Sequence, residues 1–147
     1  DGEFDAPLGM STGAGSIFGA TGGVMEAAIR TVYEVVTGKE PQSLDFTACR
    51  GQEGVKEATL DLDGTPVKVA ITNGLKNARY LMDKIRAGEA DYQFIEVMCC
   101  PGGCIAGAGT LADPAKSVAM LNKYKNEATM KVATETPYQD SLDLLHY

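Results

Sequence analysis

The sequence has little positive charge and a single histidine. Lys and Arg number 13 against 20 for Asp and Glu, which gives a formal net charge of −7. A general nucleic-acid binder would carry a basic patch, so we expect no nucleic-acid partner. The only histidine, His146, is the residue before the last, whereas zinc sites usually take paired CxxC motifs or a second cluster of ligands.

Long apolar runs and a basic N-terminus are also missing. No uncharged apolar stretch approaches the roughly 20 residues that cross a bilayer, so we expect no membrane partner. Residues 1–5 are acidic where a secretory signal would be basic. Because the first residue is not Met, we expect a processed chain or one cut from a longer protein.

What the sequence does have is glycine and cysteine concentrated in short stretches. Of 17 glycines, 11 lie within residues 1–23 and 102–109. Three of the four cysteines stand at positions 99, 100 and 104, and the fourth is Cys49. Such glycines are typical of backbone that takes positive φ or passes close to a ligand. We therefore predict a single domain over 1–147, with its chemistry in these stretches.

The hydrophobic pattern predicts a glycine-rich loop over 1–22 and then a helix over about 23–37, ended by Gly38. One face of that helix carries an apolar stripe formed by Met25, Ile29, Val32 and Val36. Alternating residues on both sides of Asp63-Gly64 predict a β-hairpin. Its turn predicts two cross-strand pairs, Leu60 with Val67 and Ala58 with Val69.

The second half of the sequence predicts two more helices and one strand. One helix runs from an Asn73 cap to about Arg86, and Gly88 follows its end. Its predicted inward face consists of Leu75, Ala78, Met82 and Ile85. Residues 92–98 predict a strand buried on both faces. Asp113-Pro114 predicts the start of a helix to about Asn126.

The tail over 127–147 is expected to attach loosely, with a short helix near 141–145. Together the elements predict an α/β fold with a small mixed sheet, a hairpin plus a buried parallel strand, flanked by about three helices.

The first glycine motif is a weak indication of a nucleotide site. Gly13, Gly15 and Gly19 give the spacing GxGxxxG rather than GxGxxG, and Phe18 occupies the position of the third glycine. No strand precedes the motif. The alternative is a tight turn that lets backbone segments approach before the helix.

The cysteine motif, Cys99-Cys-Pro-Gly-Gly-Cys104, is more informative. It follows the predicted strand, and open α/β sheets tend to bind ligands at the carboxyl ends of strands. Soft thiolates favour iron–sulfur clusters, zinc or copper(I). A zinc or redox site would need Cys49 close to the other three cysteines. A further alternative is free thiols beside a tight turn, whereas adjacent cysteines without a secretory signal disfavour disulfides.

Several segments resemble the catalytic domain of iron-only ([FeFe]) hydrogenases. Glu96-Val-Met-Cys-Cys-Pro-Gly-Gly-Cys-Ile-Ala-Gly-Ala-Gly109 is similar to the last cysteine signature of that family. Other similar segments follow in the family's order, at residues 11–28, 50–58 and 73–79, with a weaker match near 135–137. The resemblance covers roughly residues 5–112.

This resemblance implies an H-cluster, a 4Fe-4S cubane linked through a cysteine sulfur to a two-iron unit, and reversible reduction of protons to dihydrogen. Carried over by position, the metal ligands are Cys100, on the cubane, and Cys104, whose thiolate bridges the two units. Phe18, Gly19 and Met98 would line the two-iron subsite beside Cys104, and Gly19 and Met98 would contact the cofactor.

The family's other two cubane cysteines lie upstream of the equivalent of Asp1, so the chain resembles only the C-terminal lobe of the iron hydrogenase large-subunit fold. Because a cubane usually takes four cysteines, we expect neither a bound H-cluster nor activity in this chain alone. Two departures stand out. Cys99 replaces a common alanine, either as a spare ligand, as a redox-sensitive neighbour or as a harmless small residue, of which we favour the last. Gly107-Ala-Gly-Thr110 replaces Gly-Gly-Gly-Gln.

The implied protein is an oxidoreductase of hydrogen metabolism in an anaerobe, cytoplasmic or, for the parent enzyme, periplasmic. Its implied partners are the missing N-terminal lobe and an electron carrier such as ferredoxin. Detached from that lobe, the chain would self-associate through exposed apolar surface. The alternative is a separately encoded or non-catalytic hydrogenase-like subunit that acts as an interaction or sensory module.

Overall fold

The computed structural model describes residues 2, 11–40 and 54–141. The helices are α1 (Gly13–Ser16), α2 (Gly23–Thr37), α3 (Leu75–Arg86) and α4 (Pro114–Glu127), and the strands are β1 (Val55–Leu62), β2 (Thr65–Asn73) and β3 (Phe94–Met98). Short 3-10 turns are η1 (Ile17–Gly19), η4 (Cys104–Ala106) and η5 (Ala133–Glu135). Within the described ranges, no helix is both long enough and apolar enough to cross a membrane.

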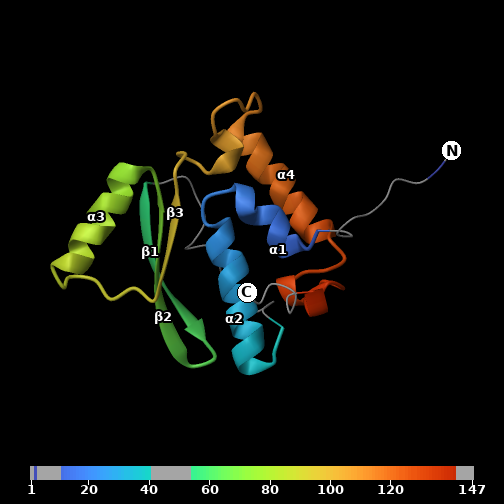
Figure 1. Ribbon diagram of the computed structural model, residues 1–147, viewed down its shortest axis with the longest axis horizontal. Helices are drawn as coiled ribbons and strands as arrows, with labels where there is room; N and C mark the ends of the chain where they lie inside the picture. The colour runs from blue at the N-terminus through green and yellow to red at the C-terminus, as the bar shows by residue number, and fades with distance from the viewer. Residues whose placement is uncertain (1, 3–10, 41–53, 142–147) are drawn as a thin grey trace.

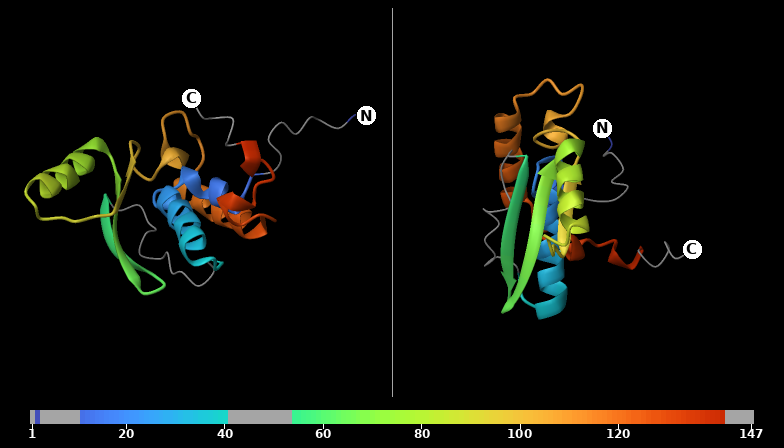
Figure 2. Two further views of the ribbon diagram at one scale, coloured as in Figure 1. Left: turned by 60° about the horizontal axis from the view of Figure 1, so that its bottom comes forward. Right: turned by 90° about the vertical axis from the view of Figure 1, so that its left-hand side faces the viewer.

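The three strands form one mixed sheet in the order β1-β2-β3. β1 and β2 are antiparallel, and β3 runs parallel to β2, which confirms the predicted mixed α/β fold. Figures 1 and 2 show α2 and α3 on opposite sides of this sheet, with α1 and α4 beyond α2. The central strand β2 is buried on both faces over 69–73 because a helix covers each side.

The predicted hairpin is confirmed, including its register. Leu60 pairs with Val67, and Ala58 pairs with Val69. Asp63 and Gly64 both take positive φ, at 55° and 91°, as the turn that joins two twisted antiparallel strands requires. Asp61 Oδ1 accepts a hydrogen bond from the Gly64 N–H at 2.7 Å, which closes the turn.

The main core lies between α2 and the α2-facing side of the sheet. Its buried members are Met25, Ile29, Tyr33, Leu60, Leu62, Val69 and Ile71. The predicted bounds of α2 are confirmed, with Gly38 at positive φ after its last turn. One residue of the predicted stripe was wrong, because Val36 is exposed and Tyr33 takes the inward place on the last turns.

The prediction for α3 was right in its bounds and wrong in its inward face. Leu81 is its buried residue, whereas Leu75 is 71% exposed, and Met82 and Ile85 are exposed as well. Among the strands, α3 packs mainly on the central one, β2, so only a narrow line of the helix is covered. Asn73 does not cap the helix: it is the last residue of β2, and Gly74 takes the N-cap position without a side-chain bond.

The last strand pairs in parallel as predicted, but only one of its faces is buried. Glu96 and Met98 point to the α2 side, while Val97, on the other side, is 48% exposed. β3 is the edge strand of the sheet, and α3 does not extend over it. The expectation of burial on both faces was therefore wrong for β3.

The described part of the N-terminal loop is partly helical, as α1 and η1 replace the loop expected over 1–22. The helix predicted after Asp113 is confirmed, and Asp113 Oδ1 accepts the Lys116 N–H at 3.0 Å. In the tail, Val132 is buried, and the Gly13 N–H donates to Met130 O at 2.7 Å. The domain limits, including the loose attachment, stay a prediction, and residues 142–145 of the expected tail helix lie outside the described residues.

Candidate functional site

The two glycine-rich stretches meet beyond the end of β3. The Thr21 N–H donates to Gly102 O at 3.4 Å, so the loop before α2 contacts the loop after β3. Gly103 has φ of 92°, and a Cβ on it would lie 2.6 Å from Gly19 O and 2.8 Å from Thr21 N. No side chain fits there, because the obstacle is backbone. The contact therefore requires glycine at position 103.

A buried carboxylate joins the same two loops. Glu96, 6% exposed, accepts the Gly22 N–H on Oε1 at 2.6 Å and the Met25 N–H on Oε2 at 2.7 Å. These amides lie at the start of α2, where the first N–H groups of a helix have no partner within the helix. In sequence, Glu96 is 74 residues from Gly22 and 71 residues from Met25, so the start of α2 is capped by a distant strand.

The electrostatics of Glu96 follow from its burial. Desolvation raises the pKa of this carboxyl above its ordinary value, against the opposing effect of the N–H groups of Gly22, Met25 and Val24. The sequence analysis did not single out Glu96 as a functional residue. Its indication in the sequence is a single charged residue among apolar ones over 94–98.

The cysteines lie on the loop that these contacts hold. Cys100 is half-buried, Cys99 and Cys104 are exposed, and all three are free thiols. The Gly103 N–H donates to Cys100 O, and the Gly107 N–H donates to Cys104 O, each at 3.0 Å, so the loop is closed by its own backbone. Cys49 lies outside the described residues, and its distance from the other cysteines stays open.

The surroundings of the thiols fit two ligands of a cluster but not a complete set. A Cβ on Gly107 would lie 3.6 Å from the Cys100 sulfur, so this glycine leaves room beside the thiol. Within the described part of the chain, no three His, Cys, Asp or Glu side chains gather closely enough to hold a metal ion. The loop could therefore offer Cys100 and Cys104 as soft ligands to a group whose other ligands come from elsewhere.

The remaining predicted site residues lie at different distances from this loop. A Cβ on Gly19 would lie 3.2 Å from Ile105 Cγ2, which places Gly19 against the turn that begins at Cys104. Met98 is buried directly before the cysteines. Phe18 is 50% exposed and lines a hollow of about 400 Å³ with residues of α1 and α2, and no cysteine lines that hollow. Their predicted roles stay predictions.

The mixed α/β domain thus presents soft thiol groups from a loop at the carboxyl end of a parallel strand, the edge at which open α/β sheets bind ligands. The family comparison makes this more specific. The chain belongs to the family described as iron only hydrogenase large subunit, C-terminal domain, whose model matches residues 1–108. This confirms the resemblance on which the sequence prediction rested.

Similar proteins include both hydrogenases and an assembly component. The chain is 52% identical over 120 residues to the periplasmic [Fe] hydrogenase large subunit of Nitratidesulfovibrio vulgaris, covering 82% of this chain and 28% of that protein. It is 28% identical over 120 residues to cytosolic iron-sulfur assembly component 3 of Mus musculus, covering 81% of this chain and 25% of that protein. The chain thus spans about a quarter of the length of these relatives.

Solved [FeFe]-hydrogenase structures share the fold. A structure of [FeFe]-hydrogenase HydA1 from Chlamydomonas reinhardtii superposes with a TM-score of 0.63 at 34% identity, covering 99% of this chain and 45% of that chain. The three-stranded mixed sheet and its helices therefore correspond to less than half of that hydrogenase chain.

Proposed function

We propose that this chain forms part of the active site of an iron-only hydrogenase, which interconverts protons, electrons and dihydrogen. The observation that carries the proposal is the junction of the two loops: Gly103 lies against backbone of the glycine-rich segment, with thiols on either side of it in sequence. Neither loop alone would be specific. Their contact is what a shared binding site for one bulky group needs.

In this proposal Cys100 would hold the cubane of the H-cluster, and Cys104 would supply the thiolate shared with its two-iron unit. The bound cluster supplies the redox chemistry of proton reduction. The chain's own residues position it: Glu96 and Gly103 fix the cysteine loop against the glycine loop. Gly19, Met98 and Phe18 line the two-iron subsite, and apolar groups there exclude water and so tune the potential of the cluster.

The remaining ligands come from a partner segment, which we propose to be the N-terminal lobe of the same hydrogenase domain. The relatives are several times longer than this chain, so they contain additional protein that such a lobe requires. We further propose that ferredoxin or a similar electron carrier supplies electrons to the full enzyme, which is cytoplasmic or periplasmic. Detached from its partner lobe, the chain is proposed to self-associate.

A chimera tests this function directly. Residues 11–112 of this chain would replace the aligned segment of the Nitratidesulfovibrio vulgaris large subunit, expressed with its normal cluster assembly. We expect H2 evolution from the chimera and its loss to background in a Cys104→Ala version. Cys99→Ala is the matched control, with activity expected within about twofold of the chimera, since Cys99 is not a ligand. An assembled cluster without H2 evolution would contradict the proposal.

The isolated chain is expected to lack both the H-cluster and activity, because two thiolates leave a cubane without half of its usual ligands. The measurements are iron content and H2 evolution of the purified 147-residue chain. H2 evolution without any other polypeptide would overturn this expectation.

A second candidate function is that of a non-catalytic relative in iron–sulfur assembly or sensing. It is favoured by the similarity to the Mus musculus component and by Ala108 and Thr110, where the hydrogenase pattern has Gly and Gln. The chimera separates the two candidates. A chimera that holds iron but evolves no H2, and that regains activity when Ala108 and Thr110 are changed to Gly and Gln, would support the second.

A further inference from the structure

Two sequence predictions are wrong in the same region of the molecule. The sequence predicts an inward-facing apolar stripe on α3, yet Leu75, Met82 and Ile85 are exposed. It predicts that β3 is buried on both faces, yet Val97 is exposed on the α3 side. We call these four side chains the α3–β3 face. Patterns typical of an interior helix and an interior strand thus lie at an edge of the sheet.

The apolar stripe of α3 lies on the flank of the helix that points away from β1. Leu81 faces the sheet, and Lys84, on one side of it, donates from Nζ to Glu57 Oε1 of β1 at 2.6 Å. Successive helical residues are rotated by about 100°, which places the stripe on the other side of Leu81. Since the strand order is β1-β2-β3, this flank points toward β3 and its free edge.

The free edge of β3 presents unpaired main-chain groups. Within the described residues, β3 has one neighbouring strand, β2. The Gln93 N–H donates to Lys68 O at 2.9 Å, directly before β3 begins. Because successive residues of a strand direct their N–H groups to opposite sides, those of Phe94 and Glu96 point away from β2. Such a row of unpaired groups is a template for another strand.

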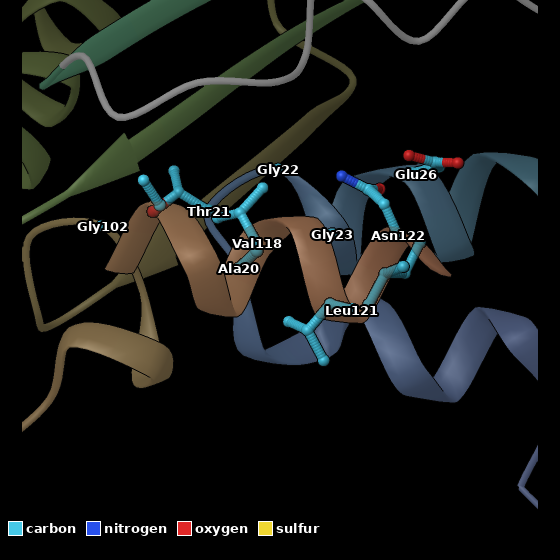
Figure 3. A pocket seen from close by; sticks show the side chains of 11 residues that line it. Ala20, Thr21, Gly22, Gly23, Glu26, Gly102, Val118, Leu121 and Asn122 are labelled. Carbon is cyan, nitrogen blue, oxygen red and sulfur yellow. The ribbon is translucent and has the colours of Figure 1, made fainter. Parts of the chain in front are cut away.

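The other side of the sheet differs, because the chain supplies its own cover beyond α2. Figure 3 shows Val118 and Leu121 of α4 lining one cavity together with residues 20–23, which lead into α2. Figures 1 and 2 show α3 by itself on its side of the sheet, with no described helix or strand beyond it. The lack of a cover is therefore a property of the α3 side.

An extended segment is the occupant that satisfies both features of this region. Its main chain can pair with the edge of β3, and the side chains on one of its faces would meet Val97 and the stripe of α3. A helix laid on the α3–β3 face would cover the apolar side chains but leave the N–H groups of Phe94 and Glu96 unpaired. The region therefore fits a strand with apolar residues at alternate positions.

The length of the relatives indicates the source of this strand. The hydrogenases described above have more than half of their length outside the segment that this chain matches. We propose that a strand from that part of the hydrogenase polypeptide pairs with the free edge of β3 and covers the α3–β3 face. The identity of the source rests on the proposed function.

Hydrogen exchange of the isolated 147-residue chain tests whether the edge is free. By 15N NMR, we expect the amides of Phe94 and Glu96 to exchange more than about tenfold faster than those of Ile95 and Val97, which point toward β2. Slow exchange at all four in a dilute sample would overturn the proposal. Protection of Phe94 and Glu96 that rises with concentration would assign the edge to a second copy and overturn it too, whereas self-association through another surface leaves both amides fast, as expected.

The chimera with the Nitratidesulfovibrio vulgaris large subunit tests the occupant. Mass spectrometry compares exchange of residues 93–98 in the chimera and in the isolated chain, and we expect protection of Phe94 and Glu96 only in the chimera. H2 evolution is recorded separately. A chimera that evolves H2 without this protection overturns the strand assignment alone, and one that gains the protection without H2 evolution contradicts the proposed function alone.

Two variants of α3 provide the second arm. Met82→Glu places a charge on the exposed stripe, so the melting temperature of the isolated chain should change little. In the chimera the yield of soluble protein should fall at least about fivefold, because the carboxylate would be buried against the added strand. Tyr80→Glu is the matched control, exposed on the flank toward β1, and should leave both measurements unchanged. Equal yields of the two chimeras would contradict the assignment to the α3–β3 face.

Discussion

The core between α2 and the sheet and the junction of the two loops are held in different ways. The core buries a continuous set of aliphatic side chains, and Ile29, Val69 and Ile71 are inaccessible to solvent. The junction instead rests on glycine backbone contacts at Gly103 and on the carboxylate of Glu96. Apolar burial is non-directional and roughly additive over area, whereas these contacts depend on a few atoms. The core therefore determines whether the chain folds, and the junction determines where the cysteines lie.

The largest expected effect is on the core. Ile71→Ala removes a fully buried side chain from β2 and should lower the free energy of unfolding by about 2–5 kcal/mol, because a cavity remains. Urea denaturation followed by circular dichroism measures it. Val35→Ala, at an exposed position of α2, should change stability by less than about 0.5 kcal/mol. Equal effects of the two substitutions would remove the distinction between core and surface.

At the junction, Gly103→Ala introduces a Cβ against the backbone of the other loop. Positive φ alone costs a non-glycine residue about 1–3 kcal/mol, and the clash with Gly19 O adds to it. Gly109→Ala is a matched control, since its φ of 86° gives similar strain while nothing lies within 4 Å of the added carbon. We expect faster alkylation of the half-buried Cys100 only in Gly103→Ala, measured by mass spectrometry against the exposed Cys104 as an internal reference. The same rates in both variants would show that strain rather than contact between the loops controls the thiols.

Glu96→Gln tests the other contact of the junction. A carboxamide keeps one acceptor oxygen and points an N–H donor at a backbone N–H, so we expect the free energy of unfolding to fall by about 1–3 kcal/mol relative to the unaltered chain. Glu89→Gln, on the surface, is the control, with no measurable change expected. Partial protection of the Gly22 and Met25 amides from hydrogen exchange should be lost only in the first variant.

The same residue gives a pH dependence. Since burial raises the pKa of Glu96 in the folded state, the folded chain binds more protons than the unfolded one above the ordinary value of 4.5. The stability contributed by the neutral form is present below that pH and is lost as the pH rises through the raised pKa. Stability of the unaltered chain should thus fall relative to Glu96→Gln over this window, and an opposite slope would contradict the assignment.

The smallest effect is expected on the outer side of the sheet. Glu57 Oε1 accepts hydrogen bonds from Lys84 Nζ at 2.6 Å and from the Tyr92 hydroxyl, an exposed cluster that joins β1 to α3. Lys84 and Tyr92 lower the pKa of Glu57, so its stabilising effect is present above pH 4.5 and lost as the pH falls through the lowered value. Glu57→Gln should lower the melting temperature only slightly at pH 7, because solvent screens exposed pairs, and the difference should shrink as the pH falls below 4.5.

Local sequence patterns predicted helices and strands well where interactions between neighbouring residues determine the structure. The Asp63-Gly64 turn fixed the register of the hairpin, and Asp113 identified the start of α4. The motif around Cys100 and Cys104 indicated the family, which the comparisons confirm. The burial of residues on α3 and β3 was less predictable. An apolar residue such as Leu75 or Val97 fits the same sequence pattern whether or not another helix or strand covers it.

By itself, the sequence determined the order of α2, β1, β2, α3, β3 and α4, the parallel last strand and the family, but it missed α1, which lies in a stretch expected to be a loop. Only the tertiary structure decided which faces are buried and which residues join the two loops. Gly103 meets Gly19 across more than 80 positions, and Glu96 reaches Gly22 across 74. A contact between distant segments exists only once the sheet and α2 have brought them together, so no local pattern encodes it.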